Sequence, residues 1–127
     1  MKKNIKILIA EDDAHIALAL KVVLRKAVEC GMTTVVSDGE QAQAALNETN
    51  YDLIISDWNM PGKTGMDLLI ENRANKETKN TPFLMLTART ELSGVKEVLN
   101  HDSTDYISKP FNNDEVIKKV LKLLDDN

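Results

Sequence analysis

Five short apolar runs alternate along the chain with segments in which apolar residues recur every three or four positions. The runs cover residues 5–10, 33–36, 53–56, 83–86 and 106–108. The periodic segments cover residues 16–27, 42–46, 66–70, 92–99 and 116–124. An unbroken apolar run of this length is typical of a buried strand, whereas three- and four-residue spacing is typical of a helix with one buried face. The pattern therefore predicts five strands and five helices in strict alternation.

This alternation predicts the way in which the elements are connected. Strands separated by helices form right-handed βαβ units, and the resulting parallel sheet is covered on both faces. The expected fold class is α/β, a flavodoxin-like (βα)5 domain with a doubly wound parallel five-stranded sheet in the order 2-1-3-4-5. The 127 residues are enough to bury a substantial core. We expect one domain that covers residues 1–127.

Three local signals set expected helix boundaries. Gly31 follows the first periodic segment and is a plausible stop for that helix. Gly94 lies within the fourth segment and is expected to interrupt that helix, at a cost of roughly 1 kcal/mol relative to alanine. Asn112 and Glu115 have the spacing of a capping box at the start of the last helix.

Polar side chains stand at the carboxyl ends of four predicted strands. Glu11 and Asp12 follow the first strand, Asp57 the third, Thr87 the fourth and Lys109 the fifth. The carboxyl ends of parallel strands lie along one edge of the sheet, where ligands bind. Three carboxylates brought together repel one another, and a hard divalent cation with oxygen ligands relieves that repulsion. With a lysine and a hydroxyl group opposite them, these residues predict a metal-dependent phosphate site.

Composition and charge exclude several other functions. The formal net charge of −4 argues against a nucleic-acid-binding surface, and Lys118, Lys119 and Lys122 are interpreted as a solvated helix face. No apolar run approaches the ~20 residues of a membrane span. The single cysteine, Cys30, fits a reducing compartment. A cytoplasmic protein that binds neither nucleic acid nor membrane is expected.

Four motifs occur in order and at fitting spacings over nearly the whole chain. They are Glu11-Asp12, Asp57-Trp58-Asn59-Met60-Pro61 with Gly65, Leu86-Thr87-Ala88, and Asp105-Tyr106 with Lys109-Pro110-Phe111. Together they resemble the receiver domain of two-component response regulators. The residues around Asp57 are most similar to those of the single-domain chemotaxis-type members of that family.

The resemblance implies that Asp57 accepts a phosphoryl group from a histidine kinase or a phosphotransfer protein in a Mg²⁺-dependent reaction. A carboxylate can attack phosphorus to form an acyl phosphate. Glu11 and Asp12 would hold the Mg²⁺ ion with Asp57, and the backbone carbonyl of Asn59 would be a further ligand. We expect Asp12 to bind the ion directly and Glu11 to bind it through water. Asp13 is expected outside this group, as a carboxylate that begins a helix.

The resemblance also assigns roles around the phosphate. Lys109 would place its ammonium group on a phosphate oxygen, and its peptide bond to the following proline would be cis. Thr87 would donate a hydrogen bond to the phosphoryl group, and Tyr106 would turn into the space that the threonine vacates. Asn59 and Arg89 are placed to modulate the lifetime of the phosphorylated state. Arg89 is expected to shield the phosphate from water; the alternatives are stabilisation of the transition state and a solvated arginine with no kinetic role.

We therefore expect a monomeric phosphoacceptor switch that is not an enzyme. It would signal to a downstream protein, such as the flagellar motor, through the surface of the fourth helix, fifth strand and fifth helix. Residues 102–105 and Gly94 depart from the family pattern on that surface. The alternatives are a phosphorelay intermediate or a receiver from a longer regulator. A small aspartyl-phosphate-type phosphatase is disfavoured, because Asn59 stands where such enzymes carry a second acid.

Overall fold

Five parallel strands form one sheet in the order β2-β1-β3-β4-β5. The structure is a computed structural model that describes residues 4–88 and 94–125. The strands are β1 (Ile5–Ala10), β2 (Cys30–Val36), β3 (Leu53–Asp57), β4 (Phe83–Thr87) and β5 (Thr104–Ser108). The helices are α1 (Ala14–Ala27), α2 (Gly39–Glu48), α3 (Gly65–Ala74), α4 (Val95–Leu99) and α5 (Asn113–Asp125). The predicted fold class and strand order are confirmed.

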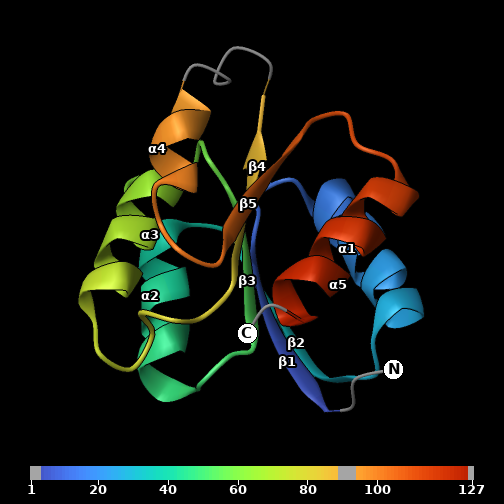
Figure 1. Cartoon of the computed structure of the whole chain (residues 1–127), viewed down its shortest axis with the longest axis horizontal. Coiled ribbons are helices and arrows are strands. Elements are labelled where there is room, and N and C mark those ends of the chain that lie inside the picture. Colours follow the sequence, from blue (N-terminus) through green and yellow to red (C-terminus); the bar gives the residue numbers. More distant parts are fainter. Residues whose placement is uncertain (1–3, 89–93, 126–127) are drawn as a thin grey trace.

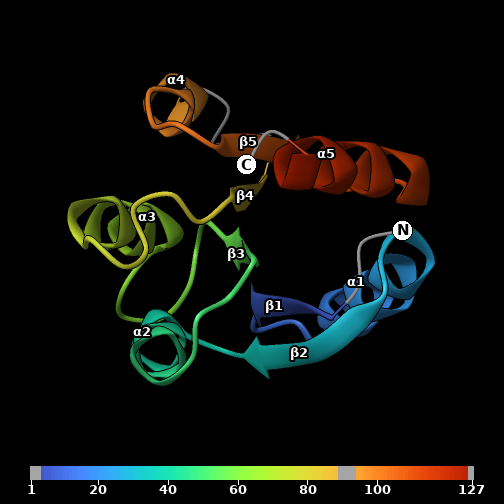
Figure 2. The same cartoon turned by 60° about the horizontal axis from the view of Figure 1, so that its bottom comes forward.

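The helices cover both faces of the sheet. Figure 1 shows α1 and α5 on one side of the strands and α2, α3 and α4 on the other. Figure 2 shows the succession of strands from β5 to β2 between these two layers. Two apolar cores follow, one between the sheet and α1 with α5, and one between the sheet and the other three helices. Within the described residues, no helix is both long and apolar enough to cross a lipid bilayer.

The burial of the strands explains why their sequences are unbroken apolar runs. In β1, Ile7 and Ile9 belong to the core beneath α1 and α5, whereas Leu8 and Ala10 belong to the opposite core. Successive side chains of a strand point to opposite faces, so a central strand needs apolar residues at every position. Every residue of β3 and β4 is buried, whereas the edge strands β2 and β5 are mostly half-buried or exposed.

The predicted role of Gly31 is wrong. Helix α1 already ends at Ala27, where the N–H of Val28 donates to the carbonyl of Leu24, and Gly31 lies inside β2. A Cβ atom at Gly31 would lie 3.0 Å from the Cα atom of Asn4. Glycine is therefore favoured there by the close approach of a neighbouring backbone, and not by the end of a helix.

The predicted role of Gly94 also needs correction. The predicted segment before Gly94 lies outside the described residues, and Gly94 itself occupies the N-cap position of α4, which begins at Val95. The start of α5 agrees better with its sequence signal. The side-chain oxygen of Asn112 accepts a hydrogen bond from the N–H of Glu115 at 2.8 Å. Such a bond satisfies a donor that has no partner within the first turn of the helix.

Candidate functional site

Three carboxylates from two neighbouring strands meet at the carboxyl edge of the sheet. Glu11 and Asp12 directly follow β1, and Asp57 ends β3, which pairs with β1. One carboxylate oxygen from each of the three lies within 4.8 Å of the others. Glu11 and Asp57 are buried, with exposed fractions of 2% and 8%, whereas Asp12 is exposed. The cluster is therefore open to solvent on the side of Asp12.

Lys109 lies against this cluster from the end of β5. Its Nζ atom is 2.9 Å from Glu11 Oε1 and 3.1 Å from Asp57 Oδ1. Its backbone N–H donates to the carbonyl of Thr87 at 2.7 Å, and its peptide bond to Pro110 is cis, as the resemblance implied. Burial by itself lowers the pKa of Lys109, but the two carboxylates outweigh burial and raise that pKa above its ordinary value. Lys109 thus stays positively charged beside Asp57.

The pKa of Glu11 is shifted by its burial and by the charges around it. Burial raises this pKa above its ordinary value, and the negative charge of Asp57 adds to the effect. The ammonium group of Lys109 and the N–H of Asp13, which donates to Glu11 Oε2 at 3.2 Å, act in the opposite direction. A set of three carboxylates with oxygen donors only is suited to a hard divalent cation such as Mg²⁺.

Asp13, unlike Glu11 and Asp12, caps a helix. It is the N-cap of α1, and its Oδ1 atom accepts hydrogen bonds from the N–H groups of His15 at 2.9 Å and Ile16 at 3.3 Å. A carboxylate in this position satisfies donors that the first turn of a helix leaves free. The prediction that Asp13 begins a helix is confirmed.

The hydroxyl group of Thr87 is buried at the end of β4. Its Oγ1 atom donates to the carbonyl of Ile107 on the neighbouring strand β5 at 3.3 Å. That distance is long for an O–H···O hydrogen bond, so little free energy holds the hydroxyl group in this orientation. Thr87 can therefore exchange this partner for a stronger acceptor, such as a phosphoryl oxygen.

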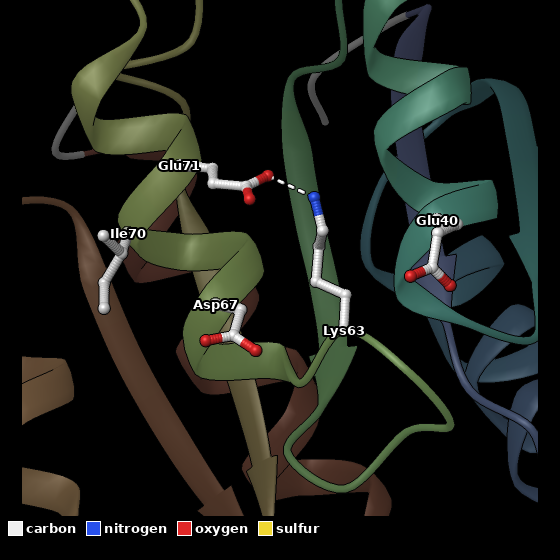
Figure 3. Close-up of a pocket in the computed structure, with 5 residues that line it drawn as sticks. All are labelled: Glu40, Lys63, Asp67, Ile70 and Glu71. Carbon is white, nitrogen blue, oxygen red and sulfur yellow. Dashed lines mark hydrogen bonds and ion pairs between the residues drawn. The ribbon is translucent and has the colours of Figure 1, made fainter.

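An ion pair and a capping box hold the loop that follows Asp57. A pocket of about 350 Å³ lies between α2 and α3. Figure 3 shows the residues that line it, Glu40, Lys63, Asp67, Ile70 and Glu71. Within it, Lys63 of the loop forms an ion pair with Glu71 of α3. Asp67 accepts a hydrogen bond from the backbone N–H of Thr64 in a capping box. These contacts fix the path of the chain between Asp57 and α3.

Comparison with known proteins decides the family. The family model of the response regulator receiver domain matches residues 7–121. The chain belongs to the response regulator receiver family. It is 34% identical to the chemotaxis protein CheY-3 of Vibrio cholerae over 98% of this chain and 95% of that protein.

Solved structures agree with the receiver fold. A response regulator from Chloroflexus aurantiacus superposes with a TM-score of 0.87 at 32% identity, over 97% of this chain and 99% of that one. The receiver domain of a sensor histidine kinase from Pseudomonas aeruginosa PAO1 has a TM-score of 0.81 at 29% identity, over 96% of this chain and 98% of that one. That second structure contains a magnesium ion coordinated in its active site cleft.

In this receiver domain Lys119 packs against Tyr106, so its interpretation as part of a solvated helix face is wrong. Lys119 is half-buried and is not part of a solvated face, unlike Lys118 and Lys122. Its Nζ atom donates to the carbonyl of Tyr106 at 2.6 Å and lies 3.2 Å from Asp105 Oδ1. It also lies 4.5 Å from the centre of the Tyr106 ring. A cation at this distance over an aromatic face is attracted to it, so Lys119 holds the ring in place.

Other predicted site residues are only partly described. The side chain of Asn59 is exposed, and its carbonyl remains a predicted metal ligand. Arg89 lies outside the described residues. Sequence reasoning missed Lys119, and no local signal could have found it, because its partners on β5 lie more than ten positions earlier in the chain.

We expect the substitution Lys119→Met to free the Tyr106 ring. The lost contact between the cation and the ring is worth ~0.5–1 kcal/mol, which changes the relative populations of ring orientations about two- to five-fold. Aromatic-ring NMR signals of Tyr106 would show the change, with Tyr51 as an internal reference. The matched control is Lys118→Met on the same helix, and an equal effect of both variants would contradict the assignment.

Proposed function

We propose that this receiver domain is a phosphoacceptor switch in which Asp57 carries the phosphoryl group. The observation that supports the proposal most directly is the arrangement around Asp57. Its carboxylate lies 3.1 Å from the ammonium group of Lys109 and within the cluster formed with Glu11 and Asp12. Phosphoryl transfer needs mostly positioning and charge neutralisation, and this arrangement offers both.

In the proposed reaction a carboxylate oxygen of Asp57 attacks the phosphorus atom. The bond from phosphorus to the donor, an imidazole nitrogen or an acetate oxygen, breaks, and the donor leaves with the bonding electrons. Lys109 neutralises negative charge on one phosphoryl oxygen. The hydroxyl group of Thr87 donates a hydrogen bond to a second phosphoryl oxygen. A Mg²⁺ ion held by Glu11, Asp12 and Asp57 would supply further positive charge for the phosphoryl oxygens when bound.

A small phosphodonor tests this proposal without any partner protein. Incubation with acetyl phosphate and MgCl₂ is expected to add one phosphate to each chain, as measured by intact-protein mass spectrometry. The adduct should be lost on treatment with hydroxylamine, which cleaves acyl phosphates. Omission of MgCl₂ should prevent the reaction. A chain that remains unmodified under all conditions would overturn the proposal.

A protein phosphodonor must dock beside Asp57, and an apolar groove borders the site there. Two adjoining pockets on α1, which share His15 and Ala19, make up this groove, and Lys109 lines the first of them. It is lined by His15, Ile16, Leu18, Ala19, Val22, Val23, Lys109, Pro110, Phe111 and Asn113. Leu18 and Val22 on α1 are 62% and 46% exposed, although both are apolar. We propose that the histidine kinase or phosphotransfer protein docks on this groove.

The substitution Leu18→Asp is expected to slow transfer from the protein donor about ten-fold or more, because docking would bury the new charge in an apolar groove. Transfer from acetyl phosphate should stay unchanged, since this donor needs no docking surface. The donor can be found by incubating the receiver with purified, autophosphorylated histidine kinases of the source organism. The exposed site Leu99→Asp on α4 is the matched control, and equal slowing at both sites would contradict the assignment.

The output of the switch is proposed to be a changed surface of α4, β5 and α5, where Tyr106 and Lys119 lie. Similarity to CheY-3 supports chemotaxis as the first pathway to test. Similarity to the receiver of a sensor histidine kinase keeps a phosphorelay as the alternative. A domain covering residues 1–127, a cytoplasmic location, a monomeric state and the absence of enzymatic turnover remain predictions.

A further inference from the structure

The indole ring of Trp58 lies directly on the backbone at the start of α4. A Cβ atom at Gly94 would lie 2.6 Å from Cη2 and 2.9 Å from Cζ2 of that ring. Both distances are shorter than carbon atoms can approach without repulsion. Because Gly94 has no side chain, the ring packs in direct contact with the N-cap of α4.

The backbone of Trp58 is held by two hydrogen bonds. It directly follows Asp57, its N–H donates to the carbonyl of Leu86 at 3.0 Å, and its carbonyl accepts from the N–H of Gly65 at 2.8 Å. The ring is half-buried and packs against the core beneath α2, α3 and α4. Movement of the ring therefore acts on the backbone that carries the Asp57 carboxylate.

Helix α4 is short within the described residues. It spans five residues, and Val95 and Val98 are its buried side chains. The ring of Trp58 thus adds a large apolar contact at the end of the helix that lies nearest to the phosphate site.

We propose that Trp58 and Gly94 form a steric link between the Asp57 backbone and the N-terminus of α4. The two are positioning residues: a shift of Asp57 is passed through the ring to the helix, and a shift of the helix is passed back. This link is separate from the one through Thr87 and Tyr106. The inference rests on the proposed function, because it assigns a regulatory contact to the same phosphoacceptor.

A double-mutant cycle tests the link. Gly94→Ala adds a methyl group that collides with the Trp58 ring. The collision is expected to displace the backbone at Asp57 and to slow phosphorylation by acetyl phosphate about three- to ten-fold. In a Trp58→Ala background the same substitution has nothing to collide with, and its effect should fall below about two-fold. An equal effect in both backgrounds, or an effect below two-fold in both, would overturn the link.

A second measurement keeps the inference testable if Gly94→Ala fails to fold. Trp58→Leu removes the ring without adding a clash, and amide hydrogen exchange of Val98 and Leu99 in α4 is expected to become faster. Amides of α5 should be unaffected and serve as the control. Unchanged exchange in α4 would overturn the link. If the wild type accepts no phosphate, the proposed function fails, whereas the exchange measurement still decides the contact between Trp58 and α4.

Discussion

Asp57→Asn is expected to abolish phosphorylation of the chain by acetyl phosphate. An amide oxygen is too weak a nucleophile to attack phosphorus, and the variant keeps Glu11 and Lys109, the other charged groups of the site. Phosphate incorporation measured by mass spectrometry should fall to background. The control is Asp114→Asn, which removes an exposed carboxylate on α5 and should leave incorporation unchanged.

The same variant should remain folded. Asparagine has nearly the shape of aspartate, and removing one of three clustered negative charges relieves repulsion with Glu11 and Asp12. The midpoint of urea unfolding should therefore stay the same or rise. Phosphate that persists in Asp57→Asn, or phosphate in the wild type that maps to a serine, threonine or histidine, would show that another residue is the acceptor.

Asp12→Ala is expected to weaken Mg²⁺ binding by ~10–100-fold or more, since even indirect partners of a metal have effects of that size. The intrinsic fluorescence of Trp58, the only tryptophan, provides the measurement, because this residue is adjacent to Asp57. Titration with MgCl₂ should change the fluorescence of the wild type and leave that of the variant nearly constant over the same range. Phosphorylation by acetyl phosphate should fall in parallel.

Asp13→Asn is the matched control for the metal ligand. Asparagine preserves the cap of α1, because its side-chain oxygen can accept the same hydrogen bonds from His15 and Ile16. The variant therefore removes a neighbouring negative charge without disturbing the helix, and Mg²⁺ affinity should change only a little. The opposite result, with Asp12→Ala unaffected and Asp13→Asn impaired, would mean that the acidic register is shifted by one residue.

The sequence by itself determined the architecture and which residues meet at the site. Apolar runs such as residues 53–56 require burial on both faces, and a parallel sheet between two helical layers provides it. Parallel strands place their carboxyl ends on one edge, so Glu11, Asp57 and Lys109 had to converge once the strands were identified. These properties follow from short-range periodicity and from general rules of chain connection.

Only the tertiary structure decided which groups touch. Gly31 and Gly94 were interpreted from their position along the chain, yet the space at each is limited by a distant neighbour, Asn4 and Trp58 respectively. Lys119 was assigned to solvent by its helix, yet it reaches Asp105 and Tyr106 on another element. Local periodicity reports which face of an element is buried, whereas the partner of a side chain depends on how whole elements pack, and that is set by the sum of many long-range contacts.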